Sequence, residues 1–192
     1  MPEDEEPTGE LAAMAAVQSV LVVRPGVLPT ARGMSHFGEH SIGWLAMSLL
    51  GAILVPCRRR YWLVAGVGVF AAHAAALLIK RIVRRTRPNH PAVAVNVSTP
   101  SPLSFPSAHA ASTAAAAILI GRASGLPKGI VAAVLVVPMA LSRIVLGVHY
   151  PSDVAFGVVL GAAVAGTTAR FDSRLSSIWP AQHGLSAGGA LK

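Results

Sequence analysis

The chain has 192 residues, of which 53% are hydrophobic and 12% are charged, and its mean hydropathy is +0.59. Soluble domains carry about 25% charged residues, so this composition excludes a soluble globular protein and excludes disorder over most of the chain. The length suits one domain rather than two.

The charged residues are distributed unevenly along the chain. Five of the eight acidic residues lie within the first ten positions, and residues 11–192 carry 16 basic residues against 3 acidic ones, a net charge of +13. Such an excess favours anionic lipid head groups or a phosphorylated substrate. The basic residues alternate with apolar segments, which argues against nucleic acid. A single cysteine, Cys57, excludes an intrachain disulfide and a four-thiolate metal site, and we expect it to be buried.

The first part of the chain contains no segment that is long enough to cross a bilayer. Residues 1–9 are polar and predict a disordered acidic N-terminus. Residues 10–23 are apolar but shorter than the roughly 20 residues of a span, so they predict a short interfacial or re-entrant helix. Residues 26–40 are interpreted as a connector. Within it, Glu39 is interpreted as the cap of the next helix, with contact to a substrate sugar as the alternative.

Five longer apolar segments follow. Backbone groups must be hydrogen-bonded within lipid, so these segments predict helices, and the fold class is an all-α integral membrane bundle with five transmembrane helices. The spans are 41–56, 61–79, 107–121, 129–147, which Pro138 is expected to kink, and 152–169. Residues 10–170 then form one domain, and residues 171–192 form a polar C-terminal tail. Gly157 and Gly161 predict close packing of the last span.

The orientation of the predicted bundle follows from its basic residues. Five spans place the Arg- and Pro-rich loop 80–106 and the turn 148–151 on the same side of the membrane. Once three basic residues reserved for chemistry are set aside, this side carries five basic residues and the opposite side carries eight. By the positive-inside rule, the opposite side is cytoplasmic. We therefore expect a multi-pass protein of the plasma membrane whose long loop lies on the extracytoplasmic face.

Ionisable residues gather at the span ends on this extracytoplasmic side. They are Lys80, His109, Arg143, His149 and Asp153, and they belong to four different spans. Charges in or beside apolar spans are costly, which makes them candidate site residues. Because four helix ends present them at one membrane depth, we expect one site there.

The cationic members of this group suit a phosphate. Lys80, Arg87 and Arg143 can neutralise a phosphate group and its transition state. Ser107 follows a proline and predicts a helix start, where free N–H groups favour an oxyanion.

The remaining members suit nucleophilic catalysis. His149 can attack phosphorus, and Asp153, four residues later on a helix, can orient its ring. His109 can protonate the leaving alkoxide. The product of the attack is a phosphohistidine, which water hydrolyses.

Three stretches containing these residues match a known pattern. They read K-x6-R-P over 80–88, P-S-A-H over 106–109 and S-R-x5-H-x3-D over 142–153. In order and spacing they resemble the signatures of the type 2 phosphatidic acid phosphatase (PAP2) superfamily of membrane lipid phosphatases, except that Ala108 stands where glycine is usual. The resemblance implies no metal or other cofactor. It also implies that His149 is the nucleophile, His109 the acid and Asp153 the orienting residue, with phosphate bound by Lys80, Arg87, Ser107, Ala108 and Arg143.

Two further stretches resemble one group of enzymes within this superfamily. Residues 33–40 and 91–97 resemble the actinobacterial decaprenylphosphoryl-5-phosphoribose phosphatases. This implies a membrane-bound polyprenyl substrate whose 5-phosphate is removed to give decaprenylphosphoryl ribose, which feeds the synthesis of cell-wall arabinan. No residue in the sequence identifies a pentose. The alternatives are a phosphatase of polyprenyl pyrophosphate, phosphatidylglycerophosphate or phosphatidic acid, and a non-catalytic protein that binds lipid phosphates. The two histidines and Asp153 argue against the last, because anion binding needs neither a nucleophile nor its orienting residue.

Other polar residues are interpreted as structural. Arg81, Arg84 and Arg85 predict a solvated or lipid-binding basic run, and His73 predicts a packed or hydrogen-bonded core residue. Four histidines lack metal-ligand spacing and are expected on the surface or in connectors: His36, His40, His90 and His183.

Overall fold

The computed structural model describes residues 6–178, which fold into α-helices joined by loops and two short 3-10 helices, η1 and η2. The elements are α1 (Gly9–Leu21), α2 (Val27–Gly38), η1 (Glu39–Ser41), α3 (Ile42–Leu54), η2 (Pro56–Arg58), α4 (Arg59–Val83), α5 (Ala108–Ser124), α6 (Lys128–Val145) and α7 (Pro151–Ile178). The described part of the chain is therefore all-α, as the sequence predicts.

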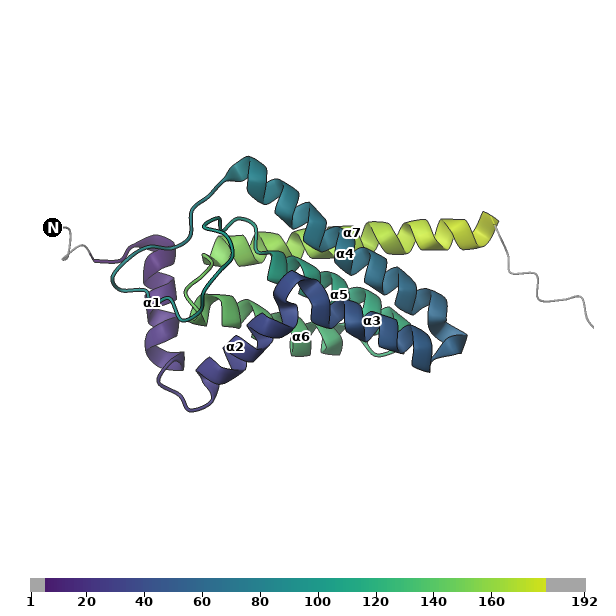
Figure 1. Ribbon diagram of the computed structural model, residues 1–192, viewed down its shortest axis with the longest axis horizontal. Helices are drawn as coiled ribbons and strands as arrows, with labels where there is room; N and C mark the ends of the chain where they lie inside the picture. The colour runs from purple at the N-terminus through teal and green to yellow at the C-terminus, as the bar shows by residue number, and fades with distance from the viewer. Residues whose placement is uncertain (1–5, 179–192) are drawn as a thin grey trace, which may run out of the picture.

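Helix α5 is the centre of the bundle. It packs against α4, α6 and α7, and 13 of its 17 residues are buried. Most of these residues are alanines, whose small side chains let neighbouring helices approach closely. Helix α3 packs on α4, and α2 packs on α6. Helix α1 stands across one end of the bundle (Figure 1).

The contact between α5 and α7 is close enough to involve backbone atoms. A Cβ atom added at Gly157 would lie 2.6 Å from the carbonyl oxygen of Ser107. A Cβ atom added at Gly161 would overlap the carbonyl oxygen of Ala111. The prediction of close packing at these two glycines is confirmed.

The outer faces of the bundle are apolar. Large exposed side chains include Leu49, Ile53, Phe70, Leu78, Val134 and Val159. Within residues 6–178, three helical stretches are long and apolar enough to cross a bilayer, namely Val27–Leu54, Pro56–Val83 and Pro151–Ser177. An apolar exterior of this kind fits contact with lipid, so the protein is a multi-pass membrane protein. The number of five spans remains a prediction.

Two features before α4 differ from those expected from the sequence. The segment 26–40 is not a connector, because α2 occupies most of it. Ala31 on α2 is buried against Val145, Leu146 and Val148, and this burial stabilises a helix that contains both proline and glycine. Cys57 is exposed, since the turn between α3 and α4 lies at the end of the bundle (Figure 1).

The last helix is longer than the predicted span. Helix α7 continues to Ile178, so the boundary expected at residue 170 falls inside it. The buried carboxylate of Asp172 explains the extension, because it lies 2.8 Å from Arg60 Nε and 3.2 Å from Arg122 Nη2. These ion pairs join α7 to α4 and α5. The rest of the expected tail, residues 179–192, lies outside the described residues, as does the acidic segment 1–5.

One pair of substitutions on α7 tests the close packing against α5. Gly161→Ala is expected to lower the free energy of unfolding by about 1–3 kcal/mol, because the added methyl group overlaps the α5 backbone. Gly166→Ala is the matched control: nothing lies within 4 Å of its added Cβ, and alanine favours a helix over glycine by roughly 0.5–1 kcal/mol. Denaturation of both variants in the same detergent measures the difference. Equal stability of the two would contradict the packing described above.

Candidate active site

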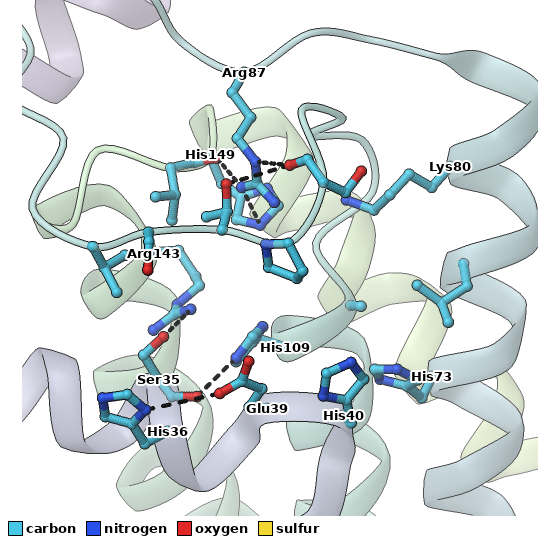
Figure 2. A pocket seen from close by; sticks show the side chains of 18 residues that line it. Ser35, His36, Glu39, His40, His73, Lys80, Arg87, His109, Arg143 and His149 are labelled. Carbon is cyan, nitrogen blue, oxygen red and sulfur yellow. Dashed lines mark hydrogen bonds and ion pairs between the residues drawn. The ribbon is translucent and has the colours of Figure 1, made fainter.

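A cavity of about 280 Å³ opens at the end of the bundle that carries the loop between α4 and α5. Six predicted site residues line it: Lys80, Arg87, Ala108, His109, Arg143 and His149 (Figure 2). They come from α4, α5, α6 and the loops that follow α4 and α6. The two other predicted residues, Ser107 and Asp153, are fully buried and lie behind this lining.

Two of the cations hold the surrounding loops as well as facing the cavity. Lys80 Nζ donates hydrogen bonds to the carbonyl oxygens of Leu103 (3.0 Å) and Ser104 (3.1 Å). Arg87 donates from Nη1 to the carbonyl oxygen of Val148 (2.6 Å) and from Nε to that of Ser101 (2.8 Å). An ammonium group has three donors, so Lys80 keeps one for a ligand. Burial lowers the pKa of Arg87 to about 10, which still leaves it charged at neutral pH.

Arg143 is 2% exposed and is only partly hydrogen-bonded. Its Nη1 donates to Ser35 Oγ (3.2 Å) and its Nε donates to Ser142 Oγ (3.1 Å). Within the described part of the chain, its Nη2 is buried without a hydrogen-bond partner. Buried guanidinium groups are normally paired, so this donor suits an anion bound in the cavity.

His149 presents one ring nitrogen to the cavity and the other to Asp153. Its Nε2 lies 3.4 Å from Arg87 Nη1, and arginine can only donate, so Nε2 carries the lone pair. Its Nδ1 lies 3.6 Å from Asp153 Oδ2, which is longer than a hydrogen bond. Burial lowers the pKa of His149 to about 3, and the charges of Arg87 and Lys80 act in the same direction. The ring is therefore neutral at pH 7, as a nucleophile requires.

His109 is held by helix α2. Its Nε2 lies 3.0 Å from the carbonyl oxygen of Ser35, and a carbonyl can only accept, so Nε2 carries the proton. A Cβ atom at Gly38 would come within 2.7 Å of the His109 ring, so only glycine lets α2 approach this closely. Ser35 contacts both His109 and Arg143, a role that the sequence reasoning missed. The sequence offered one indication of this role, because Ser35 lies within the stretch 33–40 that resembles the phosphatases named above.

Ser107 acts at the start of α5. Its hydroxyl oxygen accepts a hydrogen bond from the amide of Ala110 (3.4 Å), which confirms the predicted helix start. Its own amide donates to the carbonyl oxygen of Asp153 (3.0 Å) and so joins α5 to α7. The cavity is lined at this helix start by Ala108, where first-turn N–H groups have no partner within the helix.

Arg85 is the main site residue that the sequence reasoning did not identify. Its guanidinium lies between two carboxylates, 2.9 Å from Asp153 Oδ1 and 2.7 Å from Glu10 Oε2. It also stacks 3.9 Å from the ring centre of Tyr150. Burial opposes the charge, but the hydrogen bond to Glu10 raises the pKa of Arg85 overall. Arg85 is therefore not part of a solvated run: it holds the carboxylate that faces His149.

Helix α1 belongs to this arrangement. Glu10 Oε1 accepts a hydrogen bond of 2.7 Å from the amide of Ser152, at the start of α7. Further along α1, Gln18 Nε2 donates to the carbonyl oxygens of Ala94 (2.8 Å) and Val145 (3.1 Å). Helix α1 has 13 residues, a length of about 20 Å, which fits the prediction that it does not cross the membrane.

The interpretation of Glu39 as a helix cap is wrong. Ser41 occupies the N-cap of α3 and makes no side-chain capping bond. Glu39 instead lines the cavity, and its carboxylate lies 3.8 Å from His36 Nδ1. The sharp turn at η1 causes the difference, because it places Glu39 before the helix start and beside the cavity.

The other histidines fall into two groups. His36, His40 and His73 line the cavity; the first two are exposed, as expected, and His73 is half-buried. His90 lies in the loop between α4 and α5, where its Nδ1 accepts a hydrogen bond of 3.1 Å from the amide of Ala92. His183 lies outside the described residues. Residues 6–178 contain no group of three His, Cys, Asp or Glu side chains placed to hold a metal ion.

Comparison with known proteins agrees with the resemblance found in the sequence. The model of the PAP2 superfamily matches residues 61–176. A decaprenylphosphoryl-5-phosphoribose phosphatase of Mycobacterium tuberculosis (strain H37Rv) is 71% identical over 161 residues, which cover 84% of this chain and 89% of that protein. A protein of the same name from Mycolicibacterium smegmatis is 60% identical over 153 residues, covering 80% of this chain and 83% of the relative.

Two solved structures share the fold. A transmembrane PAP2-type phosphatidylglycerolphosphate phosphatase from Bacillus subtilis matches with a TM-score of 0.69 and 24% identity, covering 85% of this chain and 86% of that one. The Aquifex aeolicus protein LpxE matches with a TM-score of 0.65 and 20% identity, covering 88% and 99%. At these identities, the similarity concerns the fold.

The role assigned to Arg85 can be tested by substitution. Arg85→Met is expected to lower kcat for phosphate release from a lipid phosphate roughly ten- to a hundredfold, because a charge-assisted hydrogen bond to Asp153 is lost. The KM is expected to change little, since Arg85 does not line the cavity. Arg85→Lys keeps the charge and should restore part of the rate.

The matched control is Arg81→Met, which removes an exposed arginine from the same basic run. It should leave kcat unchanged. If Arg85→Met also keeps the wild-type kcat, Asp153 does not depend on Arg85.

Proposed function

The chain belongs to the PAP2 superfamily of phosphatases, and from this premise we propose that it removes the 5-phosphate of decaprenylphosphoryl-5-phosphoribose. The observation that carries the proposal is a single cavity in which three cations and two histidines meet. The high identity to the mycobacterial phosphatases supports the choice of substrate. The product, decaprenylphosphoryl ribose, would feed the arabinose donor of cell-wall arabinan.

The proposed reaction begins with attack by His149. Its Nε2 lone pair forms a bond to phosphorus, and the bond from phosphorus to the ribose O5 breaks. His109, in its imidazolium form, gives a ring proton to the departing oxygen and becomes neutral, so it can accept a proton in the next step. The phosphohistidine is then hydrolysed by water, which His109 deprotonates, and inorganic phosphate leaves. Asp153 stabilises the positive charge that His149 acquires during the attack.

The cations stabilise the charge of the transition state. The remaining donor of Lys80, the guanidinium of Arg87 and the free Nη2 of Arg143 converge on the cavity. Burial of Lys80 and Arg143 away from water strengthens their effect. Backbone N–H groups at Ala108 add to them. These groups supply the positive charge that phosphoryl transfer needs, so the proposed mechanism uses no metal ion.

We place the active site at the extracytoplasmic face of the plasma membrane. The excess of basic residues at the opposite end supports this orientation. We count five spans, with α5 and α6 added to the three longer ones. Helix α5 has 17 residues, about 26 Å, and it is surrounded by other helices, so its short length does not expose polar ends to lipid. Helix α1 lies in the interface, and the polyprenyl chain of the substrate stays in the bilayer.

Phosphate release by the purified protein in detergent, with EDTA present, tests the proposal. The substrates compared are decaprenylphosphoryl-5-phosphoribose, polyprenyl pyrophosphate, phosphatidylglycerophosphate and phosphatidic acid. We expect the highest kcat/KM for the phosphoribose lipid. His149→Ala is expected to lower kcat by at least roughly a thousandfold, because it removes the nucleophile, while binding of the lipid persists.

The outcomes separate the alternatives. Preference for another lipid, with the same loss in His149→Ala, would keep the mechanism and reject the substrate. Release that EDTA abolishes would reject the metal-free mechanism. Lipid binding without release by the wild type would favour a non-catalytic protein.

A further inference from the structure

The cavity has two walls of opposite character. Lys80, Arg87 and Arg143 form one, which we call the cationic wall. Glu39, His40 and His73 line the other side, which we call the acceptor wall, and Figure 2 shows them across the cavity from Lys80 and Arg87. The proposed mechanism uses none of these three acceptor-wall residues.

The acceptor wall is held in place by an unusual backbone turn. His40 and Ser41 both have left-handed backbone angles, with φ of 49° and 61°. Residues other than glycine rarely adopt this conformation, and where they do the position is often functional. The turn brings Ser41 Oγ to 2.9 Å from His73 Nδ1. This hydrogen bond fixes the His73 ring and leaves its Nε2 for a ligand.

The chemistry of the acceptor wall suits hydroxyl groups rather than a second phosphate. A carboxylate accepts hydrogen bonds and repels anions, and a neutral imidazole both accepts and donates one. The Glu39 carboxylate is half-buried, so its charge is less screened than at an open surface. A substrate that carries its phosphate to the cationic wall therefore meets the acceptor wall with an uncharged, hydroxylated part.

The cavity also reaches the apolar exterior. Leu77 of α4 lines the cavity and is 39% exposed. It lies on the same helix as Phe70 and Leu78, which are 62% and 61% exposed. An apolar chain leaving the cavity beside Leu77 would thus pass directly onto the lipid-facing surface of α4.

We propose that Glu39, His40 and His73 form a subsite that binds the hydroxyl groups of the substrate's pentose, between the phosphate at the cationic wall and the lipid chain at Leu77. This inference rests on the proposed function and assigns the part of the substrate that the motifs do not explain. It also gives Glu39 a selective role. In a polyprenyl pyrophosphate, the second phosphate would occupy the position of the pentose and meet the carboxylate.

Glu39→Gln separates these effects, because it keeps the size of the side chain and removes its charge. We expect kcat/KM for decaprenylphosphoryl-5-phosphoribose to fall roughly tenfold, since a charge-assisted hydrogen bond is weakened. We expect kcat/KM for polyprenyl pyrophosphate to rise, since a repulsion is removed. Hydrolysis of phosphatidic acid, which has no free hydroxyl group, should stay within about twofold of wild type and report that the variant is folded.

The matched control is Glu6→Gln, which makes the same change at an exposed carboxylate before α1. It should leave all three rates unchanged. His40→Ala provides a second variant of the acceptor wall and should lower only the rate with the phosphoribose lipid.

The two proposals fail in different ways. A wild type that prefers the phosphoribose lipid, with Glu39→Gln and His40→Ala leaving the ratio of the two prenyl substrates unchanged, would overturn the subsite alone. Equal loss on every substrate would do the same. A wild type without preference for the phosphoribose lipid would overturn the proposed function, and the subsite with it.

Discussion

The arrangement of the site depends on a fully buried carboxylate, that of Asp153. A buried charge is tolerated only when other groups compensate it. Arg85 Nη1 and the amide of Tyr150 do so, each at 2.9 Å. These two groups come from the loops before α5 and before α7, and Glu10 binds Arg85 from α1. Compensating one charge therefore fixes three segments around His149, whose Nδ1 lies 3.6 Å from the same carboxylate.

Two cations of the cavity also have more than one structural role. Lys80 and Arg87 each donate to carbonyl oxygens of the surrounding loops, so the groups that face the ligand also shape the cavity. Charged donors fixed before the ligand arrives need no reorganisation during the reaction, and this is the main source of electrostatic catalysis. The hydrogen bonds of Lys80 and Arg87 thus hold the loop between α4 and α5 in the conformation that forms one side of the cavity.

The meeting of charged residues from the ends of apolar segments in one cavity was predictable, because charge near lipid is costly and is retained there only where it serves a site. Arg85 was not predictable from the sequence, since it stands in a run with Arg81 and Arg84. Only its contacts in the folded protein distinguish it from them. Arg84 ends α4 in a left-handed conformation, with φ of 55°, and the chain turns there. The partners of Arg85 lie 68 and 75 residues away. Helix α2 was missed for a related reason, because its burial against α6 joins segments that are far apart in the sequence.

A cavity with unlike walls explains how one enzyme can distinguish two phosphates on one lipid. The terminal monoester carries up to two negative charges and matches three cations, whereas the phosphodiester at the other end of the pentose carries one. A pentose bound at the acceptor wall occupies the space between the cationic wall and the exit beside Leu77. The diester is then held one sugar away from His149, towards the lipid. Selectivity for the monoester follows from where the sugar lies as well as from charge, and both depend on α2 and η1 closing over His109.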